Sequence, residues 1–178
     1  DVRVIQALYR ASAAGVTIDL CVRGVCCLRP GVPGVSDNIR VFSIVGRFLE
    51  HERVFLFGLP GEEQMFLSSA DWMPRNLHRR VEVLFPVEAA PLREQLRREV
   101  LEPALGDTAH AYDMSADGTY ARRTPRDGEP ARSAQIEVLE RTVGRAAEEA
   151  RAASATPPVT PPERSARAPR AETAAVEA

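Results

Sequence analysis

Three segments of the chain combine residue types that could bind and transfer a phosphoryl group. Residues 22–31 carry arginines beside small residues, residues 47–53 carry His51 between two glutamates, and residues 68–83 combine serines with arginines. Each segment adjoins the end of a predicted strand, and ligands of α/β proteins bind where strands end. Imidazole, guanidinium and hydroxyl groups that converge on one crevice suit a phosphate better than other common ligands. The sequence therefore predicts a phosphate site.

His51 and Arg23 are the two strongest candidate residues. An imidazole beside a transferring phosphoryl group can donate a proton to the leaving oxygen or form a hydrogen bond to the developing charge. The alternative for His51 is a surface or capping residue. Arg23 ends a predicted buried strand, where an unpaired guanidinium is costly. It either makes a bidentate phosphate contact or forms an ion pair with Asp19 or Asp37.

Arg75, Arg79 and Arg80 form a cationic cluster directly after Ser69. Such a cluster either lines a channel for a polyanion or is a solvated surface. Arg80 is the preferred phosphate ligand of the three, because its predicted side faces the end of the strand.

Other polar and aromatic residues of the same region leave alternatives open. Ser69 either holds a phosphate oxygen or caps the following turn, with Asp71 as a rival cap. Trp72 is predicted to anchor the core rather than to stack on adenine. His78 and His110 are predicted to be structural or exposed.

The apolar pattern predicts alternating helices and strands that position these residues. An amphipathic helix over 3–14 is ended by Gly15, and a β-branched, buried parallel strand over 16–22 follows. The long loop over 23–38 has the length of a functional loop. A strand over 39–45 then leads to a short helical turn over 46–51, which presents His51.

The second half of the chain predicts two hairpins and two longer helices. Strands over 54–57 and 65–67 flank Gly58 and Gly61, and a small hairpin over 112–122 is centred on Asp117-Gly118. The remaining elements are a loop or short helix over 71–79, a strand over 81–85, a helix over 91–105 that starts at a proline, and a helical pattern over 133–152. The fold class is therefore α/β, with a mixed sheet flanked by helices.

Composition restricts the function classes. The chain has 178 residues, a net charge of -2 and a pI near 6.0, which argues against a general binder of nucleic acid or membrane surfaces. It contains no lysine, which excludes a P-loop kinase. No signal peptide or membrane-spanning run is visible, so the expected location is the cytoplasm. The three cysteines, Cys21, Cys26 and Cys27, are predicted to be small core residues in a reducing compartment rather than zinc ligands.

Several blocks of the sequence resemble one branch of the phospholipase D superfamily, the long polyphosphate kinases. The resemblance runs from residue 1 to about 105 and more loosely to about 125. The blocks are Leu8-Tyr9-Arg10-Ala11-Ser12, Val22-Arg23-Gly24-Val25-Cys26, Ser36-Asp37-Asn38-Ile39-Arg40, Ser43-Ile44-Val45-Gly46-Arg47-Phe48-Leu49-Glu50-His51 and Ser68-Ser69-Ala70-Asp71-Trp72-Met73.

The resemblance implies the second of two phospholipase D-like domains of an ATP:polyphosphate phosphotransferase. It implies ATP or ADP and inorganic polyphosphate as partners, Mg²⁺ as cofactor with ligands outside this chain, and a homo-oligomer, and it allows peripheral association with a membrane. The family phosphorylates a histidine that has no counterpart here. Its second histidine matches His51 and its nucleotide-contacting arginine matches Arg23, so both inherit an ATP-site role. Arg80 matches a further phosphate-facing arginine.

The resemblance also has limits. A phospholipase D hydrolase has a lysine two residues after its histidine and an aspartate further on, whereas this chain has Arg53 and then no acid at the second position. The alternatives are nevertheless a phosphodiesterase with His51 as nucleophile and a non-catalytic polyphosphate-binding module.

The domain organisation follows from the same blocks. We expect a C-terminal phospholipase D-like domain over 1–125 that lacks its start, a terminal helix over 126–152 and a disordered Ala/Pro-rich tail over 153–178. The chain is thus expected to be a C-terminal fragment that is inactive alone.

Overall fold

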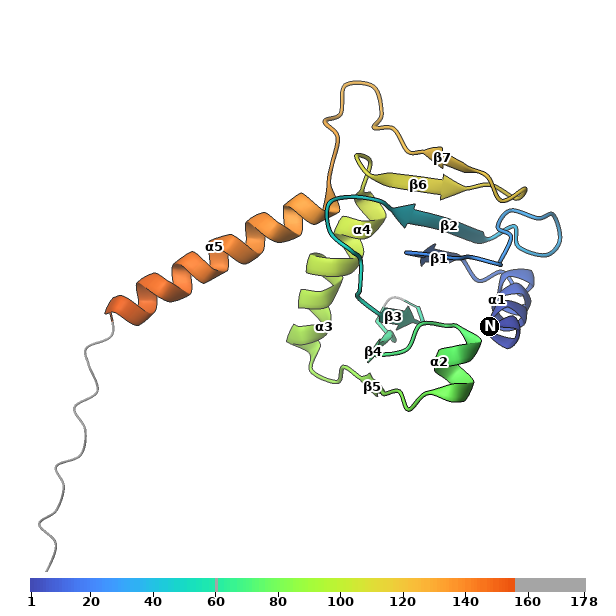
Figure 1. Ribbon diagram of the computed structural model, residues 1–178, viewed down its shortest axis with the longest axis horizontal. Helices are drawn as coiled ribbons and strands as arrows, with labels where there is room; N and C mark the ends of the chain where they lie inside the picture. The colour runs from blue at the N-terminus through green and yellow to red at the C-terminus, as the bar shows by residue number, and fades with distance from the viewer. Residues whose placement is uncertain (60, 156–178) are drawn as a thin grey trace, which may run out of the picture. The chain divides into compact units, whose positions relative to one another are not determined.

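The computed structural model describes residues 1–59 and 61–155 and contains two separate β-sheets with helices beside them (Figure 1). The chain divides into two compact units, Asp1–Val143 and Gly144–Ala178. The α/β class and the mixed sheet predicted from the sequence are confirmed, whereas the second sheet was not anticipated. None of the helices in the described part of the chain is long and apolar enough to cross a membrane.

Helix α1 (Val2–Ala13) opens the structure, as predicted. The Asp1 carboxylate accepts hydrogen bonds from the backbone nitrogens of Arg3 and Val4 and so caps the first turn. At the other end Gly15 adopts a φ of 90°, a left-handed conformation that ends a helix at little steric cost. The apolar face of α1 packs against the sheet through Ile5, Leu8 and Tyr9.

The four-stranded sheet has the order β1-β2-β6-β7 (Figure 1). β1 (Ile18–Cys21) pairs in parallel with β2 (Ile39–Ile44), and β6 (Ala111–Met114) and β7 (Tyr120–Arg122) continue the sheet as an antiparallel hairpin. The hairpin predicted around Asp117-Gly118 is therefore confirmed.

The core lies on both faces of β2. One cluster contains Ile39 and Val41 with Leu28, and the other contains Phe42 and Ile44 with residues of β6 and α5. Successive strand residues point to opposite faces, so β2 is buried on both sides. This is why four of its six residues, Ile39, Val41, Phe42 and Ile44, are apolar, whereas Arg40 is exposed.

β1 is less buried than its sequence predicted. It lies at an edge of the sheet among the described residues, and its side chains alternate between half-buried and exposed. Cys21 and Cys27 are exposed and Cys26 is half-buried. The prediction of three core cysteines was therefore wrong, because a β-branched run also suits an edge strand that is covered on one face only.

The three-stranded antiparallel sheet contains β3 (Val54–Phe57), β4 (Gln64–Ser68) and β5 (Leu84–Pro86). The predicted hairpin is confirmed, with Gly58 and Gly61 in positive-φ conformations. β5 begins three residues later than predicted, and the Val81 side chain is fully exposed. Helix α2 (Pro74–Arg79) occupies the segment predicted as a loop or short helix.

The helix predicted over 91–105 is confirmed as a helical segment with a change of winding. It consists of α3 (Ala90–Leu96), the π-helical turn η1 (Arg97–Leu101) and α4 (Glu102–Gly106). Pro103 supplies no N–H to the preceding turn, so the regular hydrogen-bond ladder cannot continue there. A π-turn at such an interruption is a common adjustment.

The helical turn predicted over 46–51 is absent, and residues 45–53 form bends and irregular backbone. The reason is a distant side chain. Gln135 accepts from the Phe48 nitrogen at 3.0 Å and donates to the Phe48 oxygen at 2.8 Å. Those backbone groups therefore have partners without a helix.

Helix α5 (Ala134–Ala155) is the last element described. Residues 126–133 lie in turns and coil, so the terminal helix expected from residue 126 starts later than predicted. The predicted domain boundary at 125 stays a prediction. The tail predicted over 153–178 lies outside the described residues from 156 onward.

Candidate phosphate site

The carboxylate of Asp71 joins two arginines that come from different sheets. Arg23 follows β1, and its Nη2 lies 3.1 and 3.3 Å from the two carboxylate oxygens of Asp71. Arg53 precedes β3, and its Nε donates to Oδ1 of Asp71 at 3.0 Å. Asp71 itself follows β4. The three segments singled out in the sequence therefore converge, as predicted.

The ion pairs of this cluster are largely withdrawn from water. The side chains of Arg53, Asp71 and Arg23 are 13%, 19% and 28% exposed. Burial alone would raise the pKa of Asp71, but hydrogen bonds from Arg53 and Arg23, together with their charges, outweigh it and hold the pKa below its usual value. Asp71 is therefore an anion at neutral pH.

His51 joins the same cluster through Arg53. Nη1 of Arg53 lies 3.3 Å from Nδ1 of His51 and 3.2 Å from the His51 carbonyl oxygen. A guanidinium can only donate, so Nδ1 must accept. The neutral ring in this arrangement carries its proton on Nε2. The His51 side chain is exposed, which leaves that N–H available to a ligand.

The cluster retains donors and positive charge for an anion. Nε and Nη1 of Arg23 and Nη2 of Arg53 have no acceptor among residues 1–59 and 61–155. Two guanidinium groups share one carboxylate, so one positive charge is left over. Guanidinium groups with free N–H donors bind phosphate through charge-assisted hydrogen bonds.

Of the two alternatives for Arg23, a phosphate contact or an ion pair, the structure contains an ion pair. The partner is Asp71 rather than Asp19 or Asp37. Asp19 pairs with Arg40 at 2.7 Å, and Asp37 accepts from the backbone nitrogen of Gly34. The predicted phosphate contact of Arg23 remains compatible with this pair.

A second polar group lies beside the first. The Ser69 hydroxyl donates to the Glu82 carboxylate, which also accepts from Nδ2 of Asn76 at 2.7 Å. Hydrogen bonds from Ser69 and Asn76 lower the pKa of Glu82, with a further contribution from the charges of Arg80 and Arg53. The cap role considered for Ser69 and Asp71 was wrong, because α2 has no side-chain cap.

Arg80 is not brought into the Asp71 cluster. It follows the last residue of α2 and is exposed, and within the described ranges it forms no ion pair. Its effect on Glu82 acts through space. Arg75 and Arg79 are exposed as well. The structure thus places the three arginines on a solvated surface beside the site, and the phosphate role predicted for Arg80 stays a prediction.

The remaining candidates have structural contacts. The half-buried Trp72 ring stacks on Phe55, with centroids 4.8 Å apart and ring planes 3° from parallel. This favours the core-anchor alternative for Trp72. Nε2 of His78 contacts the Asp1 carboxylate at 2.8 Å, and Nδ1 of His110 contacts the Ser133 hydroxyl at 3.1 Å.

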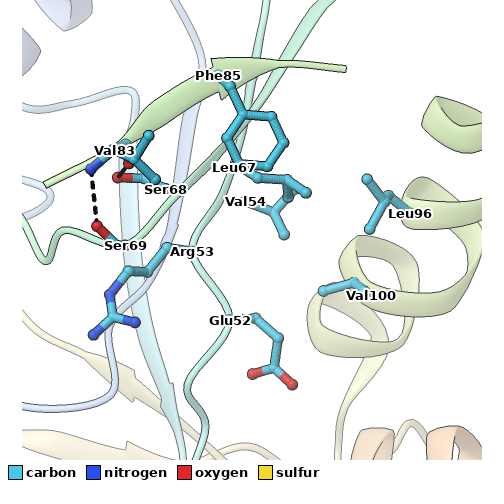
Figure 2. A pocket seen from close by; sticks show the side chains of 10 residues that line it. All are labelled: Glu52, Arg53, Val54, Leu67, Ser68, Ser69, Val83, Phe85, Leu96 and Val100. Carbon is cyan, nitrogen blue, oxygen red and sulfur yellow. Dashed lines mark hydrogen bonds between the residues drawn. The ribbon is translucent and has the colours of Figure 1, made fainter. Parts of the chain in front are cut away.

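An open pocket of about 400 Å³ adjoins the cluster. Figure 2 shows Val54, Leu67 and Phe85 on one wall, facing Leu96 and Val100, whereas Arg53 extends the other way, below Ser69. Arg53 therefore stands at the boundary between an apolar wall and the polar cluster. The pocket is not wholly apolar, because the Glu52 carboxylate and the Ser68 and Ser69 hydroxyls also line it.

The described residues do not fit a Mg²⁺ site. In the ranges 1–59 and 61–155, no three His, Cys, Asp or Glu side chains gather closely enough to hold a metal ion. The two carboxylates of the site are engaged by arginines (Asp71) and by Ser69 and Asn76 (Glu82). That the ligands of Mg²⁺ lie outside this chain stays a prediction.

Two residues of the cluster, Asp71 and Arg53, were missed as functional residues. A signal for Arg53 existed in its spacing from His51, because it stands two residues on, where the phospholipase D pattern has its lysine. For Asp71, the only signal was its position after Ser68 and Ser69, within one of the blocks that resemble the polyphosphate kinases. Its pairing with an arginine 48 positions earlier has no local signature.

Comparisons with known proteins identify the family. The sequence model of "Polyphosphate kinase C-terminal domain 2" matches residues 1–135. The chain is 58% identical over 141 residues to a polyphosphate kinase of Pseudomonas putida, which covers 79% of this chain and 19% of that protein. It is 52% identical over 143 residues to one of Thermosynechococcus vestitus, which covers 80% of this chain and 19% of that protein.

A solved structure gives the same answer. The crystal structure of polyphosphate kinase from Porphyromonas gingivalis superposes with a TM-score of 0.75 at 42% identity, over 83% of this chain and 22% of that one. The chain thus spans about a fifth of the length of the curated relatives it matches. On these grounds the chain belongs to the polyphosphate kinase family, in which it corresponds to the C-terminal domain.

Proposed function

We propose that this chain works as the C-terminal domain of a polyphosphate kinase, an enzyme that reversibly transfers the terminal phosphoryl group of ATP to inorganic polyphosphate. The family match over residues 1–135 supports this proposal. The proposed partners are ATP or ADP and polyphosphate. Homo-oligomeric assembly, peripheral membrane association and a cytoplasmic location stay predictions from the resemblance.

The observation that carries the proposal is the pair of guanidinium groups on one carboxylate. Arg23 and Arg53 are held by Asp71 at 3.0–3.3 Å and keep free N–H donors and an excess positive charge. The transition state of phosphoryl transfer spreads negative charge over the equatorial oxygens of the phosphoryl group. Donors already oriented toward such oxygens stabilise the charge without reorganising during the reaction.

His51 acts beside these arginines. Its Nδ1 is engaged by Arg53, so Nε2–H is the donor that can reach a phosphate oxygen. In the proposed reaction this N–H forms a hydrogen bond to a phosphoryl oxygen and stabilises the charge that develops there. The phosphorylated histidine of the family lies outside this chain, so His51 assists transfer and does not carry the phosphoryl group. Arg80 contributes as a further phosphate ligand on the rim.

The test is polyphosphate formation from ATP and Mg²⁺ by the intact protein that contains this chain. The variants are His51→Ala and Arg23→Gln, and Arg40→Gln is the matched control because Arg40 also pairs with an aspartate but lies outside the cluster. We expect both site variants to lose most activity while they stay folded, and the control to keep it. Full activity of both site variants would refute the proposed roles.

The same measurements separate the alternatives. A non-catalytic polyphosphate-binding module predicts no activity in the wild type and polyanion affinity that survives His51→Ala. A phosphodiesterase predicts hydrolysis of a chromogenic phosphodiester. The chain alone should make no polyphosphate, because the phosphorylated histidine is absent from it.

A further inference from the structure

We propose that Asp71 is a positioning residue of the phosphate site: it orients Arg23 and Arg53 relative to each other and, through Arg53, selects the His51 tautomer with its proton on Nε2. This inference rests on the proposed function for its biological meaning. Its geometry rests on the contacts alone.

The Asp71 carboxylate is shared by the two arginines. Its Oδ1 accepts from both Arg53 Nε, at 3.0 Å, and Arg23 Nη2, at 3.3 Å, while Oδ2 accepts from Arg23 Nη2 at 3.1 Å. In the described part of the chain neither arginine has another ion-pair partner. The two guanidinium groups come from the segments after β1 and before β3, so Asp71 is the link that fixes one against the other.

Loss of the Asp71 carboxylate would leave two partly buried arginine charges without their partner. Arg53 is 13% exposed and Asp71 is 19% exposed, so neither charge is fully solvated. Removing one partner of such a pair leaves the other charge partly buried and uncompensated. Without Asp71, Arg23 and Arg53 would repel each other and could regain a partner only by moving apart.

Arg53 connects Asp71 to the imidazole of His51. Arg53 uses Nε for Asp71 and Nη1 for Nδ1 and the carbonyl oxygen of His51. The planar guanidinium fixes the direction of both sets of bonds at once. An Arg53 side chain that is anchored at Nε by Asp71 is therefore held with Nη1 pointing at His51.

The excess charge explains why only one carboxylate, that of Asp71, forms ion pairs with these arginines. A second acid would neutralise both arginines and repel a phosphate. One acid aligns the donors of two arginines and leaves one positive charge within the ion-paired cluster, and the Glu82 carboxylate acts on Arg53 only through space. Asp71 therefore orients the arginine donors and leaves others of their N–H groups free for a phosphate.

The experiment is a double-mutant cycle on phosphate binding by the intact protein. The variants are Asp71→Asn, Arg23→Gln and the double variant, and the probe is inorganic tripolyphosphate, with Kd measured by calorimetry. Asn replaces the charge at nearly constant volume. Asp19→Asn is the matched control, because Asp19 also pairs with an arginine but lies outside the cluster.

If Asp71 acts through the arginines, its removal costs less once Arg23 is gone, because only its effect on Arg53 is left to lose. We expect Asp71→Asn and Arg23→Gln each to weaken binding about tenfold, and the double variant to be no more than about threefold weaker than Arg23→Gln, since coupled residues are non-additive. Two independent effects would multiply to about a hundredfold, and that outcome would overturn the proposal. Wild-type affinity in Asp71→Asn would overturn it as well.

Two further readouts separate positioning from a general structural role and from the proposed function. Thermal unfolding checks that Asp71→Asn is folded; if it is not, Asp71→Glu, which keeps the charge, enters the same cycle with the same expected coupling. Polyphosphate synthesis from ATP tests the function. Coupled binding without synthesis would reject the proposed function and keep the positioning role, whereas synthesis with additive effects would do the reverse.

Discussion

The side-chain amide of Gln135 forms two hydrogen bonds with the backbone of Phe48, although 87 positions separate the two residues. Its oxygen accepts from the Phe48 nitrogen, and its nitrogen donates to the Phe48 oxygen and to the Glu50 carboxylate. Phe48 lies three residues before His51. The position of the candidate imidazole thus depends on the first turn of α5.

Gln135→Ala should destabilise the folded chain and lower activity in the intact protein. The variant leaves the Phe48 amide without a partner at a partly buried position, which costs about 1–3 kcal/mol. Urea denaturation measures the loss. Gln6→Ala is the control, because Gln6 is exposed on α1 and its side chain forms no hydrogen bond within the described residues. Equal stability of both variants would contradict the role of Gln135.

Gly46→Ala should disturb the same contact from the other side. A Cβ at residue 46 would overlap Oε1 of Gln135 and approach its Cδ to 2.8 Å, so the amide would have to move away from Phe48. We expect a loss of stability of about 1–3 kcal/mol, as for overpacking. Gly144→Ala is the matched control, since a Cβ there meets nothing within 4 Å and the residue lies in a helix, where alanine is favoured over glycine. Thermal unfolding of the two variants decides the matter.

Asp107→Asn should weaken the join between α4, β6 and α5. The fully buried carboxylate accepts from the backbone nitrogens of His110 and Ala111 at Oδ1 and of Ala134 at Oδ2. An asparagine has only one acceptor oxygen, so one backbone N–H would face the amide NH₂. A destabilisation of about 1–3 kcal/mol follows. Asp127→Asn, on an exposed turn, should change the free energy of unfolding by less than about 0.5 kcal/mol.

The stability contributed by Asp71 should depend on pH in a defined direction. Because the arginines hold the pKa of Asp71 below its usual value despite burial, the folded state favours the ionised carboxylate. That contribution is complete above the ordinary aspartate pKa of about 3.9 and is lost as the pH falls through the lower folded value. The stability difference between wild type and Asp71→Asn should therefore be constant from pH 6 to 8, to within about 0.5 kcal/mol, and shrink in acid. A difference that grows in acid would contradict the ion pairs.

Trp72→Ala should destabilise the chain by about 1–3 kcal/mol, less than the 3–5 kcal/mol of a fully buried tryptophan. The reason is loss of the stacked contact with Phe55. Trp72→Phe keeps an aromatic face for stacking and should cost less than about 1.5 kcal/mol. Circular dichroism during urea unfolding compares the two. Similar losses in both variants would show that the stack adds nothing beyond the size of the side chain.

The sequence alone determined the elements whose signals are local. Gly15 marks the end of α1, and Gly58 and Gly61 mark the β3–β4 turn, because a positive-φ residue acts within a few positions. The apolar residues over 39–45 predicted a strand, and the structure shows that this strand, β2, is the one buried on both faces. The family blocks selected Arg23 and His51 in the same way, as short motifs in a fixed order.

Only the tertiary structure decided how those residues are connected. Arg23 pairs with Asp71 across 48 positions, and the segment before His51 is not helical, because Gln135 satisfies the backbone groups of Phe48. β1 is half exposed because it lies at a sheet edge among the described residues. Its β-branched residues do not distinguish an edge strand from a central one. A buried polar group takes the partner that the fold brings within reach, wherever that partner lies in the chain. Residue types and spacing therefore predicted a phosphate site, and the contact between distant segments determined that one carboxylate organises it.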